Sequence, residues 1–316
     1  MEGNKHEYAP IALFAFKRPK HLKITLDSLL LNPEIKKTFL YVFVDKFLDN
    51  NDKEANLKVK NLLKDYSYKF QNMEIIFNKK NKGLANNITE GIKTVFKKHE
   101  KIIVLEDDIE VADTFLNYMN RALDKYSDEK KVWHISGYVQ PFKYEGEKDS
   151  FFWSYMNCWG WGTWRDRWQY YFKDTDLILK SFNKIMIKKF NFNNLIPEWD
   201  QIIDNKKNKI NTWAVFWYAS IFINNGLCLN PTKSLTRNIG FDNTGENCCE
   251  DFTMISQDIA MVKDLKFPIF VEEDKEIIYR LKLYFKEKNS FIFIKRAIVN
   301  KLPFFNFLRK KLKNRK

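Results

Sequence analysis

The sequence predicts an α/β fold in which a mostly parallel central sheet is flanked by helices. Short apolar runs of about five residues alternate with longer segments whose apolar residues recur at helical spacing. That alternation is typical of strand–helix–strand units with right-handed crossovers. With 316 residues, 45% of them hydrophobic, the chain can bury the core of one large domain or of two small ones.

The individual elements follow that alternation in order. The expected strands are Ile11–Phe16, Phe39–Val44, Met73–Phe77, Ile102–Leu105 and Val132–Ser136. The expected helices are the segment with Leu22, Leu26, Leu29 and Leu30, then Asn51–Phe70, Leu84–Lys98 and a helix that ends near Tyr126. Pro19 ends the first strand, because proline cannot continue a hydrogen-bonded ladder.

Polar residues follow four of these strands at the point where each strand ends. They are Lys17 and Arg18, Asp45, the loop Asn78–Gly83, and the triplet Glu106, Asp107 and Asp108. Ligands of parallel sheets bind outside the carboxyl ends of the strands, so we expect the four loops to meet at one edge. A cationic pair, a lone acid, a glycine-containing loop and a carboxylate cluster could together hold a nucleotide, its diphosphate and a metal ion.

The acidic triplet stands out because it follows four apolar residues in a row, Ile102–Leu105. Three carboxylates this close repel one another unless a cation lies among them, and hard divalent cations prefer oxygen ligands. The alternative is a helix start, with Asp108 as the N-cap of a helix that runs from Ile109 to Tyr126. Both interpretations stay open on this stretch alone.

The second half of the chain is aromatic. Trp159, Trp161 and Trp164 lie in the stretch CWGWGTW, within a crowd of aromatic residues between 151 and 168. Such rings either stack on the apolar faces of sugars or form the core, and both alternatives are open. Trp213–Phe222 is expected to be a buried helix, and residues 238–247 a glycine- and asparagine-rich lid.

The net charge of +14 is concentrated at the C-terminus. Residues 275–316 hold 14 Lys and Arg against two acids, which gives +12 and leaves +2 for the body. A nearly neutral body argues against a nucleic-acid binder. Residues 291–316 combine apolar clusters with cations, which suits a helix at an anionic membrane surface; a solvated basic tail is the alternative.

The cellular location is expected to be cytoplasmic, peripheral on the inner face of the cell membrane. The first ten residues lack the apolar core of a signal peptide, and no apolar run is long enough for a spanning helix. Four cysteines without metal-ligand spacing are expected to be reduced thiols: Cys158, Cys228, Cys248 and Cys249.

The chain resembles GT-A glycosyltransferases, specifically bacterial family 2-type sugar transferases similar to the N-acetylglucosaminyltransferase I family. Five blocks carry the resemblance, in order: FAFKRP at Phe14–Pro19, NKGLANNITEGI at Asn81–Ile92, the block Ile102–Tyr126 around the acidic triplet, CWGWGTW at Cys158–Trp164, and Asn211–Asp242. They cover most of residues 10–250. The resemblance implies a GT-A domain at 1–274, with a donor half at about 9–137, an acceptor half at about 138–274 and a basic tail at 275–316.

The resemblance also implies the ligands. The donor is a nucleotide-diphospho-sugar, with a UDP-sugar favoured, and the cofactor is Mn²⁺ or Mg²⁺. Asp108 would ligate the metal, with Glu106 and Asp107 assisting through water or ribose. The other nucleotide contacts would be Lys17, Arg18, Asp45, Lys82, Gly83 and Asn87, and the acceptor would meet Trp159, Trp161 and Trp164.

Two departures from the family pattern concern catalysis. Related lids carry a histidine shortly after a glycine, whereas Glu246 and Asn247 follow Gly245 here. The relatives' catalytic base is an aspartate just after a tryptophan, whereas Ala214 follows Trp213. The substitutes for the base are Asp200 and Glu198, with Asp242 as runner-up.

The implied activity is metal-dependent and inverting transfer of a hexosyl or N-acetylhexosaminyl group to a hydroxyl. Its acceptor would be a glycan or lipid-linked glycan, in the synthesis of bacterial capsule, lipopolysaccharide or O-antigen. The alternative, consistent with both departures, is a catalytically impaired protein that only binds sugar nucleotides.

Overall fold

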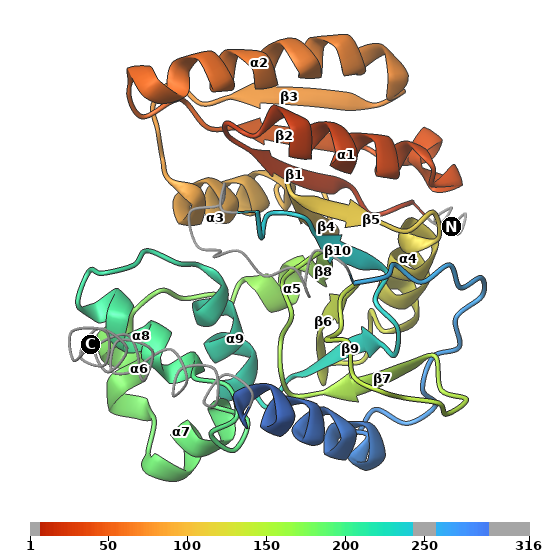
Figure 1. The fold of residues 1–316 in the computed structure, drawn as a ribbon, viewed down its shortest axis with the longest axis vertical. Helices are drawn as coiled ribbons and strands as arrows, with labels where there is room; N and C mark the ends of the chain where they lie inside the picture. The colour runs from red at the N-terminus through yellow and green to blue at the C-terminus, as the bar shows by residue number, and fades with distance from the viewer. Residues whose placement is uncertain (1–6, 243–256, 291–316) are drawn as a thin grey trace, which may run out of the picture.

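An eight-stranded sheet flanked by helices runs through the molecule, which confirms the predicted α/β class (Figure 1). This computed structural model describes residues 7–242 and 257–290. The strands are β1 (Ile11–Ala15), β2 (Leu40–Val44), β3 (Met73–Phe77), β4 (Lys101–Glu106), β5 (Ile109–Val111), β6 (Val132–Ser136), β7 (Ser150–Trp153), β8 (Trp161–Trp164), β9 (Leu227–Pro231) and β10 (Thr236–Asn238). The helices are α1 (Pro19–Leu30), α2 (Asn50–Tyr66), α3 (Leu84–Val95), α4 (Phe115–Lys125), α5 (Arg165–Trp168), α6 (Thr175–Ser181), α7 (Lys184–Phe190), α8 (Glu198–Lys206) and α9 (Ala214–Ile223), followed by a helix over 275–290.

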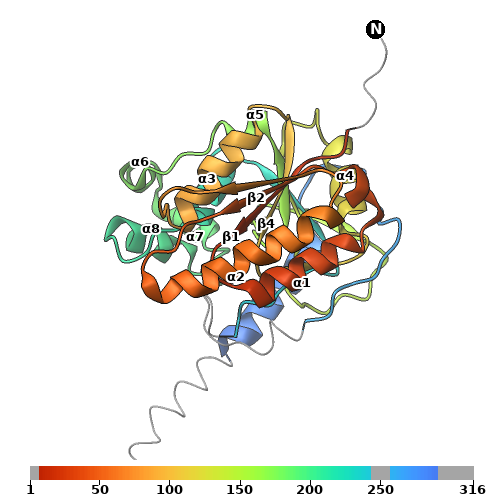
Figure 2. The same ribbon diagram turned by 90° about the horizontal axis from the view of Figure 1, so that it is seen from above.

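The first half of the sheet is parallel throughout, in the order β3-β2-β1-β4. Alternate side chains of β1 enter two different cores. Ile11 and Leu13 pack with α1, whereas Ala12 and Phe14 pack with α3. Figure 2 shows α1 and α2 on one face of these strands and α3 on the other. A strand covered on both faces reads as a continuous apolar run, which is why the sequence revealed these strands.

The second half of the sheet mixes directions. Its order is β8-β6-β9-β7, with β8 antiparallel to both β4 and β6 and β9 parallel to β6. Two successive reversals leave β6 running in the same direction as β4. The loops that follow β4 and β6 therefore open on the same edge of the sheet.

A short two-stranded ribbon corrects the alternative in which Asp108 caps a helix. Residues Ile109–Val111 form β5, which pairs antiparallel with β10, and α4 begins only at Phe115. The ribbon brings the end of β10 back to the acidic triplet, because Asn238 stands opposite Ile109.

The predicted boundary before a basic tail at 275 does not coincide with the edge of the packed body. The side chains of Ile277 and Leu281, on the helix 275–290, are fully buried in the core shared with α9. Residues 291–316 and the lid residues 243–247 lie outside the described residues. Among the described helices, none combines the length and apolar character that crossing a bilayer requires.

Candidate functional site

The first part of the site lies where β1 and β4 end side by side. The strands pair in parallel, with Phe14 opposite Glu106, so the residues that follow them meet at one edge. The Arg18 guanidinium donates from Nε and Nη2 to Oδ1 of Asp107, at 3.0 and 2.5 Å. Its Nη1 lies 2.9 Å from Oδ2 of Asp108. One guanidinium therefore bridges both aspartates of the acidic cluster, a name we use for Glu106, Asp107 and Asp108.

The ionisation of the acidic cluster is strongly perturbed. Burial and the neighbouring Asp108 charge raise the pKa of Glu106 to about 8. Burial also raises the pKa of Asp107 to about 6, although Arg18 opposes that shift. A further positive charge beside these carboxylates would lower both pKa values, because it stabilises the ionised forms.

Asp45, at the end of β2, is the centre of the second part of the site. Its buried carboxylate accepts the backbone N–H groups of Lys82 at 3.0 Å and of Gly83 at 2.9 Å. The side chain of Asn78 donates to this carboxylate at 3.1 Å and to the Asn87 amide oxygen at 2.9 Å. Gly83 precedes α3 with φ of 71°, in the left-handed region that favours glycine. Asp45 and Asn87 therefore position the loop between β3 and α3.

The two predicted lysine contacts are engaged by carboxylates of nearby helices. Lys17 Nζ lies 2.7 Å from Asp52, and Lys82 Nζ lies 2.7 Å from Glu90. Both lysine side chains remain partly exposed, and ion pairs of that kind contribute little stability. Either ammonium group can therefore turn to an anionic ligand at low cost.

The third part of the site is the segment that leaves β10. The backbone N–H of Ile239 donates to the Asp108 carbonyl at 2.9 Å. A Cβ added at Gly240 would stand 2.2 Å from Asp108 Oδ2 and 2.9 Å from Arg18 Nη1. Any larger residue here would displace Asp108 or Arg18 from their present contact.

Among the three predicted bases, the structure brings Asp242 beside the acidic cluster. Asp242 follows Gly240 by two residues, and its carboxylate lies 3.0 Å from Nε2 of His21 on α1. The sequence reasoning missed His21. The signal was its place in the first turn of α1, three residues after Arg18, the N-cap of that helix.

The other two candidates, Glu198 and Asp200, lie in the first turn of α8. Glu198 accepts the Tyr155 hydroxyl at 2.6 Å and the Gln201 side chain at 2.7 Å, and burial raises its pKa. Asp200 is exposed. Among the contacts of the described residues, none joins either carboxylate to the acidic cluster.

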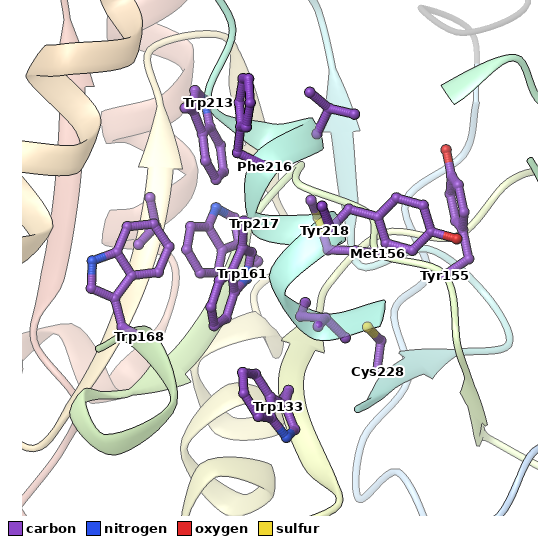
Figure 3. Packing of buried hydrophobic residues seen from close by; sticks show 14 of the residues in the cluster. Trp133, Tyr155, Met156, Trp161, Trp168, Trp213, Phe216, Trp217, Tyr218 and Cys228 are labelled. Carbon is purple, nitrogen blue, oxygen red and sulfur yellow. The ribbon is translucent and has the colours of Figure 1, made fainter. Parts of the chain in front are cut away.

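Two of the three predicted acceptor tryptophans belong to the core. Trp161 is 1% exposed and stacks on Trp213 with ring centroids 5.3 Å apart, in contact with Trp168 and Trp217 (Figure 3). Trp164 is also buried, and its indole N–H donates to a backbone carbonyl of α4 at 3.0 Å. A ring enclosed in this way cannot stack on a sugar, so an acceptor role for Trp161 and Trp164 is wrong. Both lie on β8, an inner strand that the sequence did not reveal.

Trp159 differs from these two because it is partly exposed. Its ring makes edge contacts with Tyr138, at a centroid distance of 4.3 Å, and with Phe241, at 5.4 Å. Phe241 follows Gly240 directly, so these three rings extend from the acidic cluster along the same edge of the sheet. Tyr138 and Phe241 were not predicted.

The residues present fit a divalent ion only in part. Within residues 7–242 and 257–290, no three side chains of His, Cys, Asp or Glu converge on a point that could hold a metal. Arg18 already engages Asp107 and one oxygen of Asp108. Mg²⁺ is commonly held by one or two carboxylates together with substrate phosphates. The cluster therefore fits an ion that a bound diphosphate helps to coordinate.

Comparisons with known proteins give limited information. No protein-family model matches the chain. No curated protein matches it either. Similar solved structures include TarS 1-349 from S. aureus (10% identity, 72% of this chain and 59% of that chain, TM-score 0.40). They also include the mannosyltransferase PcManGT from Pyrobaculum calidifontis in complex with GDP-Man and Mn²⁺ (9% identity, 69% and 71%, TM-score 0.38).

A third similar structure is an active-site mutant of LgtC (11% identity, 67% and 70%, TM-score 0.36). Of the TarS fragment, the chain spans less than two thirds of the length. At such low TM-scores the likeness to all three carries no weight in the argument that follows.

Proposed function

We propose that the protein is a GT-A-type glycosyltransferase that moves a sugar from a nucleotide-diphospho-sugar to an acceptor hydroxyl with the help of Mn²⁺ or Mg²⁺. The single observation that carries this proposal is the meeting of Arg18 with Asp107 and Asp108 at the ends of β1 and β4. A carboxylate cluster paired with a guanidinium offers groups for both a cation and a diphosphate at one place. Two of the five sequence blocks that carry the resemblance, Phe14–Pro19 and Ile102–Tyr126, contain these three residues.

The donor would bind along the edge formed by β1, β2 and β4. Arg18, with Lys17 and Lys82 nearby, would attract the diphosphate. The loop positioned by Asp45 and Asn87 would border the nucleoside. Asp108 would hold the divalent ion, with Glu106 and Asp107 close by. That ion would supply Lewis-acid stabilisation of the charge that develops on the leaving diphosphate.

The acceptor would lie over the other side of the acidic cluster. Trp159, flanked by Tyr138 and Phe241, offers a partly exposed ring for the apolar face of a sugar. Asp242 is our first choice for the base that accepts the proton of the acceptor hydroxyl, because it follows by two residues Gly240, whose backbone packs against Asp108. His21 would orient the Asp242 carboxylate. Glu198 and Asp200 become the second choice.

The finer features of the reaction follow from the sequence resemblance. We propose direct, inverting attack, a hexosyl or N-acetylhexosaminyl group, and a UDP-sugar as the favoured donor. The acceptor would be a glycan or lipid-linked glycan in the synthesis of bacterial surface polysaccharide. Residues 291–316 would hold the enzyme at the inner face of the membrane.

A donor panel tests the proposal. The thermal unfolding midpoint would be measured with UDP, GDP, CDP and dTDP, each with and without Mn²⁺. Turnover of the matching sugar nucleotides would follow for the best binder. We expect one nucleotide to raise the midpoint only with Mn²⁺, and its sugar nucleotides to be consumed. Absence of any metal-dependent shift across the panel would refute the proposal.

The impaired binding protein remains a second candidate, because Ala214 replaces the expected base and Asp242 is already paired with His21. It predicts the same metal-dependent shift without hydrolysis of the donor or transfer to any acceptor. The turnover arm of the donor panel therefore separates the two functions.

A further inference from the structure

We propose that Arg18 is a built-in counter-cation that closes the acidic cluster to free divalent ions, so that a metal binds tightly only together with a diphosphate. This inference rests on the proposed function, because it concerns how the same site is loaded. It assigns to Arg18 a role in metal loading besides contact with the nucleotide.

The first support is the rigidity of the Arg18–Asp107 pair. Asp107 Oδ1 receives two guanidinium N–H groups, and its Oδ2 accepts the backbone N–H of Phe16 at 3.3 Å. The Thr25 hydroxyl holds the Asp107 carbonyl at 2.9 Å. The two-point contact fixes the plane of the guanidinium, as is common for arginine and carboxylate. Arg18 is therefore held in place by β1, α1 and the end of β4 together.

The second support is the position of the remaining guanidinium nitrogen. Nη1 lies 2.9 Å from Oδ2 of Asp108, the carboxylate proposed above to hold the metal. Gly240 passes over this contact at a distance that leaves no room for a Cβ. A divalent ion that approached Asp108 would therefore meet a positive charge already in contact with that carboxylate.

The third support is the charge balance. The side chains of Arg18, Asp107 and Asp108 are only 18%, 4% and 7% exposed, so solvent screens their interaction weakly. The lysines nearby, Lys17 and Lys82, are paired with other carboxylates. Within the part of the chain that the structure describes, Arg18 is thus the cation whose ion pairs reach the cluster.

A bound diphosphate changes this balance. Its oxygens can accept the Nη1–H that Asp108 now accepts, while Nε and Nη2 stay on Asp107. Asp108 would then be released towards a divalent ion that the same diphosphate coordinates. Metal and nucleotide would each tighten the other by the same factor, as thermodynamic linkage requires.

The test measures Mn²⁺ binding by electron paramagnetic resonance of the free ion, with no nucleotide and with saturating UDP, GDP, CDP or dTDP. For wild type we expect weak binding of Mn²⁺ alone and binding at least about tenfold tighter with one nucleotide. Arg18→Gln keeps a donor to Asp107 but removes the charge. It should tighten the Kd for Mn²⁺ alone by about tenfold or more and reduce the coupling.

Two further variants give the comparison its control. Arg18→Lys keeps the charge and should leave the Kd for Mn²⁺ alone near the wild-type value. Arg237→Met removes a similar part-buried ion pair, the 2.5 Å contact of Arg237 with Glu110 on the β5–β10 ribbon, and should change nothing. If Arg18→Gln does not fold, Arg18→Met, which fills the volume with an apolar chain, takes its place.

The outcomes are distinguishable. Coupling in wild type together with an unchanged Kd for Mn²⁺ alone in the uncharged Arg18 variant overturns this inference and leaves the proposed function standing. A shift of the same size in Arg237→Met overturns it as well, because the effect would not be specific to the cluster. A wild-type protein that binds no Mn²⁺ with any of the four nucleotides overturns both.

Discussion

The two halves of the sheet use their residues in opposite ways. In the first half, β1, β2 and the four central residues of β4 are apolar and buried, and the polar residues of the site follow at the carboxyl ends of the strands. In the second half, polar and aromatic groups enter the interior, where His134 stacks on Trp161 and the indole N–H of Trp217 donates to Nδ1 of His134 at 3.2 Å. A polar residue that follows a parallel strand lies at the carboxyl edge of the sheet, so its position can be predicted. A tryptophan can pack in a core or stack on a sugar, so its sequence position alone does not decide its role.

The largest expected effect concerns the tryptophan core. Trp161→Ala removes a fully enclosed ring and should lower the free energy of unfolding by about 4 kcal/mol. Trp159→Ala, the matched control on a partly exposed ring, should cost much less stability and reduce acceptor affinity instead. Chemical denaturation of both variants checks the difference. Equal losses would mean that the two rings share one environment, against the contrast drawn here.

This contrast explains how far the sequence could lead. The inner parallel strands β1, β2 and β4, and the loops after them, were predictable because strands buried on both faces form nearly continuous apolar runs. The strand β8 was not, because WGTW has no period-two pattern and becomes a strand only by pairing with β4 and β6. The ribbon of β5 and β10 was hidden for the same reason, since the pairing joins residues that are far apart in the chain.

The site shows the same division. Arg18, Asp45 and Asp108 could be identified because each follows an apolar strand. Gly240 and Phe241 could not, since they come near the acidic cluster only through the return of β10. Contacts between residues far apart in the chain, such as those made by the segment after β10, leave no recognisable pattern in the local sequence.

The second prediction concerns Asp45, whose carboxylate positions the loop after β3 in the first half of the sheet. Asp45→Asn replaces an acceptor of backbone N–H groups by an amide that must place a donor against them. We expect a loss of about 2–3 kcal/mol in the free energy of unfolding, the usual scale for hydrogen bonds to a charged group. Nucleotide affinity should fall with it. Asp49→Asn, at the exposed N-cap of α2, is a matched control that should cost less. An Asp45→Asn variant as stable as wild type would contradict the anchoring role.

The third prediction uses the pKa of Glu106 in the first half. Burial and Asp108 raise this pKa to about 8 from 4.5, so the folded state binds a proton that the unfolded state releases. Stability should therefore fall as the pH rises, by about 2 kcal/mol between pH 6 and 8 in metal-free buffer. Glu106→Gln should abolish that loss in denaturant titrations at each pH. A loss that persists in the variant would exclude Glu106 as its source.

The fourth prediction concerns His134, whose pKa has the opposite effect. Burial lowers this pKa to about 3 from 6.5, although the contact of Nε2 with the Asn157 carbonyl raises it. The unfolded state therefore gains a proton first as the pH falls. His134 should cost about 1 kcal/mol between pH 7 and 5.5, taken as the difference from His134→Gln. The same pH dependence in both proteins would show that His134 does not titrate on unfolding.

The most direct test of the central claim is calorimetric titration of the best-binding nucleoside diphosphate into wild type and Asp108→Ala, each with and without Mn²⁺. The account predicts that Mn²⁺ tightens binding to wild type by about tenfold or more and has no effect on Asp108→Ala. The variant should remain folded without metal, because Arg18 keeps both of its hydrogen bonds to Asp107 and the repulsion from Asp108 is gone. Equal enhancement by Mn²⁺ in both proteins would contradict the proposed role of Asp108 and, with it, the proposal that this sheet edge binds the metal and the diphosphate.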